Sequence, residues 1–332
     1  MILTVTPNPA LDLTWHVDHL QPGETHRVPA GAARAGGKGL NVARVLHAQG
    51  HDVLALTTTG GAVGAEFAAE LDSSGIPHRL IAVTGATRRS IALVDETSGE
   101  TSVLNERGAP LEPDEVAALT SSALELGRNA DAVAICGSLP AGFGPDELGA
   151  LVGSLVDAGV PVIVDTSGPG LAAAARAGAS ALKPNAEELR AETGLDDPVA
   201  GARALTALGA GIVVASLGSE GLMIVTADAR GDIRAGLPRR LHGNATGAGD
   251  AAVAAIAAAL AETPDLAADS DAAASARARL ARRATAWSAS AVLMPLAGEL
   301  SPEHAALELE VVVTTTRTIT GSAGPSDPEA TA

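Results

Sequence analysis

The stretch from Gly243 to Ile256 carries the residues whose types and spacing are best suited to chemistry. Its turn, Gly247–Gly249, leads into an Ala-rich run that predicts a helix from Asp250 to Ala261. The first N–H groups of a helix have no internal partners and attract anions. A carboxylate at that place, Asp250, suits a general base beside a phosphoryl group. The alternative is a plain helix cap, because Asp is common at helix starts.

The placement of lysine is a second feature. The chain has 22 basic residues, and only two of them are lysines, Lys38 and Lys183. Both lie in short stretches rich in Gly or Pro, where a compact ammonium ion suits contact with phosphates; chance placement in loops is the alternative. Gly36–Gly39 opens a helix predicted over Leu40–Gln49, but its spacing does not fit a Walker A loop, so that site is excluded.

Further polar residues follow predicted strands. Asp12 comes after the strand Ile2–Thr6, where open α/β sheets usually contact ligands, or it stabilises a turn. Asn185 and Glu188 are three residues apart at a predicted helix start, so both can point the same way. Their spacing predicts a capping box or part of a metal shell, and the two can coexist.

The elements that must position these residues alternate regularly. Each predicted helix is followed by a predicted strand, which indicates a mostly parallel sheet with helices on both faces. Two early hairpins break this rhythm and predict a small separate sheet over the ligand site. The helix and strand pairs are Pro113–Leu126 with Ala132–Cys136, Pro145–Ala158 with Pro161–Asp165, and Pro198–Leu208 with Gly211–Ser216; the hairpins are Leu13–Val17 with His26–Ala30, and Thr87–Asp95 with Thr101–Asn105.

Composition limits the partners and the location. Of the 332 residues 46% are hydrophobic and only 1% aromatic, so the core must consist of Val, Leu, Ile and Ala. The net charge of −17 argues against binding to nucleic acid or to an anionic membrane. No apolar run is long enough to span a bilayer, and the first residues read as a strand and not as a signal peptide. With a single cysteine, Cys136, the expected location is cytoplasmic.

Seven motifs in one order resemble the ribokinase-like, PfkB-type carbohydrate kinases, over about residues 1–320. The likeness is greatest to the hexose-phosphate branch, which holds 1-phosphofructokinase, tagatose-6-phosphate kinase and the minor 6-phosphofructokinase. The resemblance implies a three-layer α/β ribokinase-like fold with a mostly parallel central sheet and a small β-sheet lid, from about 11–33 and 87–106. Residues 321–332 are predicted to be a disordered tail. The motifs are Thr6–Asp12, Gly36–Ala43, Thr87–Arg88, Gly137–Gly142, Lys183–Leu189, Ser216–Gly221 and Gly247–Asp250.

The resemblance also implies a reaction and its residues. We expect ATP-dependent phosphorylation of a ketohexose phosphate, above all fructose 1-phosphate to fructose 1,6-bisphosphate, with Asp250 as the general base and Gly247-Ala248-Gly249 as the anion hole. Mg²⁺ is expected to be held largely through water by Asn185 and Glu188. The implied ATP-binding residues are Lys183, Asn185, Ser216, Gly218, Gly221, Thr246, Gly247, Ala248 and Gly249, and the implied substrate-binding residues are Asp12, Gly37, Lys38, Asn41, Arg88 and Ser138.

The choice of substrate stays open among several classes. The alternatives are tagatose 6-phosphate or fructose 6-phosphate, then a neutral sugar or nucleoside, then a non-catalytic sugar-phosphate sensor. Because the chain is acidic overall, a phosphosugar needs a local cationic clamp, for which Arg88 and Lys38 are candidates with Arg27 and Arg89 as helpers. Strand alternation lets only one of Arg88 and Arg89 face the pocket, and the motif favours Arg88. A homodimer through the lid is implied, and Ala245 stands where the family usually has Ser or Thr.

Overall fold

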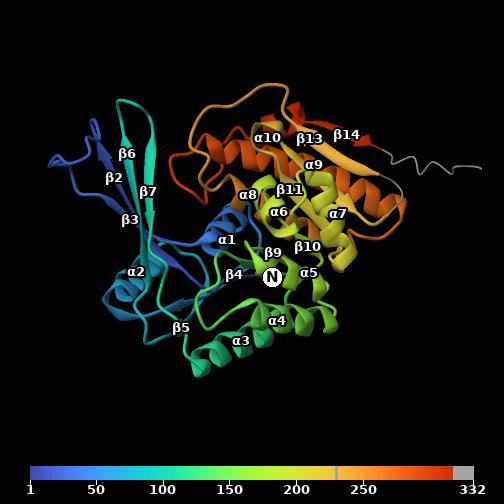
Figure 1. The fold of residues 1–332 in the computed structure, drawn as a ribbon, viewed down its shortest axis with the longest axis horizontal. Coiled ribbons are helices and arrows are strands. Elements are labelled where there is room, and N and C mark those ends of the chain that lie inside the picture. The colour runs from blue at the N-terminus through green and yellow to red at the C-terminus, as the bar shows by residue number, and fades with distance from the viewer. Residues whose placement is uncertain (229–230, 317–332) are drawn as a thin grey trace, which may run out of the picture.

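The fold consists of a large body and a small sheet that stands over one end of it (Figure 1). The structure is a computed structural model that describes residues 1–228 and 231–316. The predicted tail at 321–332 lies outside the described residues. The body contains a ten-stranded sheet and the small sheet has four strands. Both the predicted mostly parallel sheet and the separate lid sheet are confirmed.

The large sheet places the carboxyl ends of several strands side by side. Its order is β14-β13-β12-β11-β10-β9-β8-β1-β4-β5, parallel from β11 to β5 and antiparallel from β11 to β14. The order of the chain reverses beside β1, and ligands of open α/β sheets bind at such a reversal. The strands are β1 (Ile2–Thr6), β4 (Val53–Thr59), β5 (His78–Ala82), β8 (Ala132–Cys136), β9 (Val162–Asp165), β10 (Ala181–Leu182), β11 (Ile212–Ser216), β12 (Leu222–Thr226), β13 (Asp232–Gly236) and β14 (Val312–Thr316).

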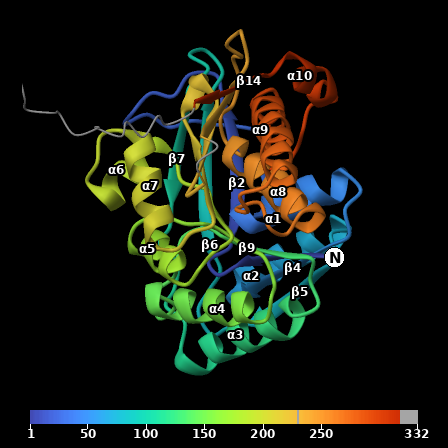
Figure 2. The same ribbon diagram turned by 90° about the vertical axis from the view of Figure 1, so that its right-hand side faces the viewer.

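Helices cover both faces of this sheet and complete the three layers (Figure 2). Alternating strand residues feed the two cores, since Ile2 belongs to the core that includes α1, α2, α8 and α9, while Leu3 and Val5 belong to the core that includes α3, α4, α5 and α7. The helices are α1 (Lys38–Ala48), α2 (Gly61–Ser73), α3 (Pro113–Gly127), α4 (Pro145–Asp157), α5 (Pro169–Arg176), α6 (Ala186–Thr193), α7 (Pro198–Leu208), α8 (Ala248–Glu262), α9 (Asp271–Val292) and α10 (His304–Glu310). Within 1–228 and 231–316, no helix is long and apolar enough to cross a membrane.

Helix α8 is buried on every side, from Asp250 to Leu260. It packs between α1 and α9, and its alanines let the neighbouring helices approach closely. A helix that is apolar all round belongs in a core. The burial of α8 fixes its first turn, and with it Asp250, at the carboxyl ends of the central strands.

The lid has the strand order β3-β2-β6-β7. Strands β6 (Arg88–Asp95) and β7 (Thr101–Asn105) form the predicted second hairpin. The prediction of a strand over His26–Ala30 is wrong, because β2 (Ala10–Val17) pairs instead with β3 (Ala32–Gly36). Strand β2 also begins earlier than predicted, so Asp12 lies inside the lid sheet, opposite Arg34 on β3 and Ser90 on β6.

Candidate active site

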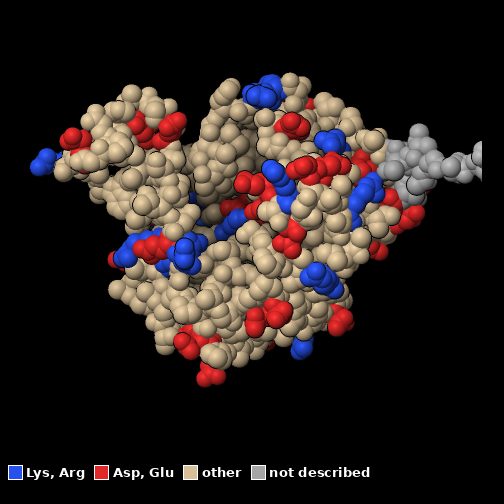
Figure 3. Space-filling view, in the orientation of Figure 1, with Lys and Arg blue, Asp and Glu red and all other residues tan. Residues whose placement is uncertain are grey.

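A large cleft opens between the lid and the body, with a volume of about 1410 Å³. Figure 3 shows the molecule hollowed at this place, with basic and acidic side chains around the hollow. The structure brings every sequence-predicted site residue to this one cleft, although their roles remain predictions. The lining includes Asp12, Gly37, Lys38, Asn41, Arg88, Ser138, Lys183, Asn185, Glu188, Ser216, Gly218, Gly221, Thr246, Gly247, Ala248, Gly249 and Asp250.

The turn before α8 has a conformation that requires glycine. Gly247 has φ +87°, and a Cβ there would lie 2.8 Å from the Cα of Ala297. The turn is braced from both sides, because the Thr246 N–H donates to Asn244 Oδ1 (3.0 Å) and Asn244 Nδ2 donates to the Pro295 carbonyl (3.1 Å). Asn244 thus supports this turn beside Ala245, the position at which the kinases that the sequence resembles usually carry Ser or Thr. The first turn of α8 then points into the cleft.

Asp250 is a buried carboxyl group at the start of α8, 6% exposed. Asn41 Nδ2 donates to its Oδ2 over 2.8 Å. Burial raises the pKa of Asp250 from 3.8 to about 6, assisted by the negative charge of Asp165 and opposed by the Asn41 hydrogen bond and by Lys38 and Lys183. A base with this pKa is ionised at neutral pH and accepts a proton more readily than an ordinary carboxylate.

A second carboxylate, Asp165, lies at the carboxyl end of β9 and is fully buried. Its Oδ1 lies 3.2 Å from Lys38 Nζ and 3.6 Å from Lys183 Nζ. Burial lowers the pKa of Lys38, but the charges of Asp165, Asp250 and Glu188 outweigh burial and leave that pKa raised. Sequence reasoning passed over Asp165, although a charged residue that ends an apolar parallel strand is itself a signal.

Asp12 faces the cleft from the lid. Burial raises its pKa from 3.8 to about 6; the positive charge of Arg88 opposes this rise, while the charge of Asp250 adds to it. The carboxylate lies against Gly36 on the neighbouring strand, where a Cβ would approach Asp12 Oδ2 to 1.9 Å. Gly36 therefore leaves the room that Asp12 needs, and the carboxylate can accept hydrogen bonds from a ligand in the cleft.

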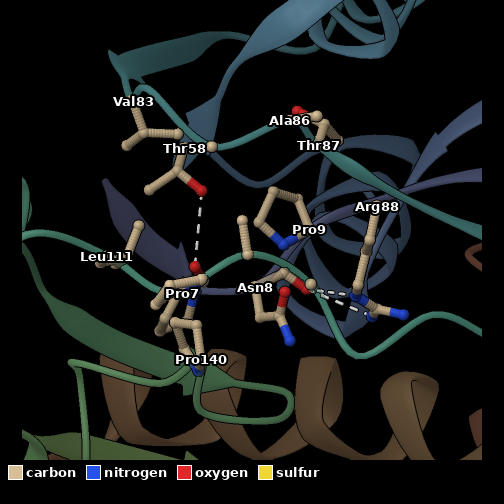
Figure 4. A pocket seen from close by; sticks show the side chains of 14 residues that line it. Pro7, Asn8, Pro9, Thr58, Val83, Ala86, Thr87, Arg88, Leu111 and Pro140 are labelled. Atoms are coloured by element: carbon tan, nitrogen blue, oxygen red, sulfur yellow. Dashed lines mark hydrogen bonds between the residues drawn. The ribbon is translucent and has the colours of Figure 1, made fainter.

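Arg88 begins β6 and lines the cleft from the lid. Its Nε and Nη2 donate to the main-chain carbonyl of Asn8 (3.4 and 3.2 Å), as Figure 4 shows, and its Nη1 donates to the carbonyl of Glu106 (3.2 Å). Arg88 is among the residues that line the cleft and its neighbour on β6, Arg89, is not, as strand alternation predicts. Arg27, which lies outside any strand, is also not among the described lining residues. These bonds hold the guanidinium against two of the chain segments that join the lid to the body.

Asn8 and Arg107 also lie at the lid junction, and sequence reasoning did not single them out. Asn8 Nδ2 donates to the carbonyl of Arg107 (3.2 Å) and to Ser138 Oγ (3.0 Å), so one amide links three loops. Behind it a cavity of about 20 Å³, large enough for a single water, is lined by Pro7, Thr58 and the loops on either side (Figure 4). Arg107 itself also lines the main cleft.

Asn185 and Glu188 form the capping box that their spacing predicts. The Glu188 N–H donates to Asn185 Oδ1, and the Asn185 N–H donates to Glu188 Oε2, both over 2.8 Å. Among the described residues, no group of three or more His, Cys, Asp and Glu side chains could hold a metal ion by itself. A single carboxylate at a cleft that can admit phosphates nevertheless fits Mg²⁺, because this ion keeps several waters and takes few protein ligands. Cap and metal contact remain compatible here.

The predicted ATP-binding side of the cleft is built from β11 and the turn after it. Ser216 ends β11, and the short 3₁₀ turn Gly218–Glu220 follows. Gly221 has φ +93°, and a Cβ there would lie 2.0 Å from the Ala235 carbonyl, so only glycine lets β12 return beside β13. Arg239 and Arg240 lie on the same side of the cleft, and Arg239 is paired with Glu310 through two contacts of 2.9 and 3.1 Å.

Comparison with known proteins agrees with this geometry. The chain is 40% identical over 267 residues to a 1-phosphofructokinase of Xanthomonas campestris pv. campestris (78% of this chain, 83% of that protein), and 35% identical over 308 residues to a 1-phosphofructokinase of Rhodobacter capsulatus (91% and 92%). Phosphofructokinase-2 from Escherichia coli in complex with potassium has a TM-score of 0.82 at 30% identity, over 92% of this chain and 98% of that chain. The same enzyme has been solved with fructose-6-phosphate and in a tetrameric inhibited form.

The family match covers most of the chain. Residues 6–294 match the family described as pfkB family carbohydrate kinase. This span holds the lid, the parallel strands β4, β5 and β8 to β11 of the large sheet, and the first turn of α8. The protein is therefore a phosphotransferase that acts on an alcohol group of a sugar, and it belongs to the pfkB family of carbohydrate kinases.

Proposed function

We propose that this kinase uses ATP to phosphorylate fructose 1-phosphate, giving fructose 1,6-bisphosphate. The observation that carries this proposal is that a buried carboxyl group, Asp250, and two arginines, Arg88 and Arg107, line the same cleft. The two relatives named 1-phosphofructokinase support the same substrate. A chain with a net charge of −17 repels anions at long range, so a phosphosugar needs such a local cluster of cations.

The residues on the body side divide the phosphoryl transfer among them. Asp250 takes the proton of the attacking sugar hydroxyl as the oxygen forms its bond to the γ-phosphorus of ATP, and the bond from that phosphorus to the β-phosphate oxygen breaks. Asn41 holds the carboxylate in place for this step. The first turn of α8, Gly247–Gly249, and Lys183 face the negative charge of the transferring group. Mg²⁺, held through water by Asn185 and Glu188, would supply further neutralisation of the phosphate oxygens.

The residues on the lid side select the sugar. Asp12 accepts hydrogen bonds from hydroxyl groups, and Arg88 grips two oxygens of the sugar's phosphate, with Lys38 and Ser138 as further contacts. Because Arg88 is bonded to two of the chain segments that connect the lid with the body, a phosphate bound there also helps to hold the lid over the cleft. Tagatose 6-phosphate and fructose 6-phosphate carry the same groups in other arrangements and are the nearest alternatives.

A substrate panel tests the proposal. Turnover of fructose 1-phosphate, fructose 6-phosphate, tagatose 6-phosphate and fructose is measured with Mg²⁺-ATP in a coupled ADP assay. We expect the highest kcat/KM with fructose 1-phosphate and poor turnover of fructose. Preference for another phosphosugar would reassign the substrate within the branch. Preference for fructose would favour a neutral-sugar kinase, and phosphosugar binding without ADP formation would favour a sensor.

The lid is also proposed as the interface of a homodimer. Its outer strand β7 is exposed along its length, with Val103 and Leu104 exposed to 50% and 55%. Apolar side chains at an open sheet edge favour pairing with another strand or sheet. Light scattering on wild type and on Leu104→Asp tests this: we expect a dimer that the substitution shifts to monomer. We propose a cytoplasmic location for the enzyme, consistent with its single cysteine, the buried Cys136.

A further inference from the structure

The only two lysines of the chain meet at one carboxylate oxygen. Lys38 and Lys183 are 145 positions apart in sequence numbering, counted as 183 minus 38, yet both ammonium groups lie beside Asp165 Oδ1, at 3.2 and 3.6 Å. They come from different walls. Lys38 opens α1 next to the sugar side, whereas Lys183 follows β10 and lies under the first turn of α8, its Nζ 3.4 Å from where a Cβ of Gly249 would be.

The surroundings of Asp165 make its charge unfavourable for the stability of the fold, so a role in the site would explain why the residue is there. The carboxyl group is fully buried, and among the described residues its second oxygen, Oδ2, has no hydrogen-bond partner. A buried charge without complete pairing destabilises a fold. The two ammonium groups border a cleft that is open to anions, and Lys38 is 40% exposed there while Lys183 is 5% exposed.

Lysine side chains need an anchor if they are to act at fixed points. Each ammonium group has three donors on a flexible four-carbon stem. One donor directed at Asp165 fixes the nitrogen and leaves the others free for phosphate oxygens. Because both lysines share Oδ1, the position of one affects the attraction felt by the other.

We propose that Asp165 is a positioning residue that holds Lys38 and Lys183 at once, and thereby joins the sugar-phosphate and nucleotide halves of the cleft. The inference rests on the proposed function, in which Lys38 contacts the sugar substrate and Lys183 contacts ATP. Asp165 touches neither substrate itself. Removing its charge releases both lysines, whereas removing one lysine leaves Asp165 to draw the other more closely to itself.

The test compares the two Michaelis constants in a set of variants. Asp165→Asn is expected to raise KM for fructose 1-phosphate and KM for ATP, each by about tenfold, which corresponds to losing roughly one charged hydrogen bond per substrate. Lys38→Met is expected to raise KM for the sugar by at least that factor. It also changes KM for ATP, by about threefold, because Lys183 is drawn toward Asp165. In the Lys38→Met background, adding Asp165→Asn should leave KM for the sugar unchanged and still raise KM for ATP.

A matched control separates positioning from general loss of structure. Asp232→Asn also removes a buried carboxylate that pairs with a cation, Arg203 at 2.8 Å, but it lies on β13 outside the residues described as lining the cleft. We expect both Michaelis constants of this variant to match wild type even if its Tm falls. If Asp165→Asn does not fold, Lys38→Met still tests whether Asp165 holds both lysines. Its effect on ATP binding is then measured by calorimetry without sugar.

The outcomes that would overturn the role of Asp165 differ from those that would overturn the proposed kinase function. Additive effects in the double variant, an effect on one substrate only, or no cross effect of Lys38→Met would overturn it. A higher Mg²⁺ requirement with both Michaelis constants unchanged at saturating Mg²⁺ would assign Asp165 to the metal and also overturn it. Lack of turnover of every phosphosugar by wild type would instead count against the proposed function, and ATP calorimetry would still test the lysine pairing.

Discussion

Replacing Asp250 by asparagine is expected to lower activity and to raise stability. The amide has nearly the same shape, and its oxygen can still accept the bond that Asn41 Nδ2 donates over 2.8 Å. It is a far poorer proton acceptor, so kcat should fall by roughly 10²–10⁴, the usual scale for loss of a general base. ATP affinity should change little, because the amide does not contact the nucleotide in the proposed arrangement.

The stability gain follows from the sign of the pKa shift. The pKa of Asp250 rises from 3.8 to about 6 because burial, and then Asp165, disfavour the charged form. A raised pKa contributes stability that is complete below pH 3.8 and lost as the pH rises through about 6. The cost of ionising the buried group at pH 8 is thus about 3 kcal/mol. A neutral amide avoids it, so Asp250→Asn should be more stable by up to about 3 kcal/mol at pH 8 and by about half as much at pH 5.

Urea unfolding at the two pH values measures the effect. Trp287 is buried in the core beside α8, so tryptophan fluorescence follows loss of packing there. Asp95→Asn is an opposite-sign control: backbone hydrogen bonds from Ser98 and Leu20 lower the pKa of Asp95 to about 2, and its stabilising contribution is present above the ordinary pKa and lost as the pH falls through about 2. That variant should be less stable than wild type at pH 8.

Two results would refute the reasoning about Asp250. If the asparagine variant is no more stable than wild type at pH 8, the carboxylate is not strained by burial in the way that its surroundings indicate. If its kcat stays within a few-fold of wild type, Asp250 is not the base, and the buried carboxyl group serves as a helix cap.

Three further predictions concern other walls of the cleft. Glu188→Gln keeps the capping hydrogen bond but loses the charge, so the Mg²⁺ needed for half-maximal activity should rise about tenfold; an unchanged Mg²⁺ titration would leave the cap as its only role. Arg88→Gln should raise KM for the phosphosugar by about 10²-fold with KM for ATP nearly constant in steady-state assays, and an equal loss with fructose would contradict a phosphate clamp. Gly247→Ala forces a Cβ to 2.8 Å from Ala297 Cα at φ +87°, so kcat should fall by about tenfold or more, and wild-type turnover would show that the turn does not shape the anion site.

Sequence signals that act over a few residues correctly predicted helix starts, a capping box and the alternation of side chains along a strand. Pro at the first helical position and acidic residues in the first turn marked α3 and α4, and their observed starts match the predicted ones. The Asn185 and Glu188 spacing gave the capping box, because both partners lie within one helical turn. Alternation along β6 separated Arg88 from Arg89 for the same reason, since a strand reverses its side chains at every residue.

The lid shows where local signals failed. His26–Ala30 alternates in polarity but contains Pro29, and no strand forms there. The strand that does form, β3 (Ala32–Gly36), consists of Ala, Arg and Gly, which have little preference for strands. It exists because β2 offers it a complete ladder from Ala10 to Thr14, and the small side chains leave room for Asp12. Pairing with a distant partner outweighed local preference.

The sequence by itself predicted the regular alternation of helices and strands in the body, the glycines at tight turns and the chemical types of the residues at the cleft. Only the tertiary structure decided which of them meet. Asp165 looks like the end of an ordinary buried strand until β9, β10 and α1 bring Lys38 and Lys183 to it. The proton affinity of Asp250 likewise comes from burial among α1, α9 and the sheet, and from a neighbouring charge 85 positions earlier, counted as 250 minus 165. Desolvation and Coulomb interactions depend on distance in space, which a local pattern does not encode.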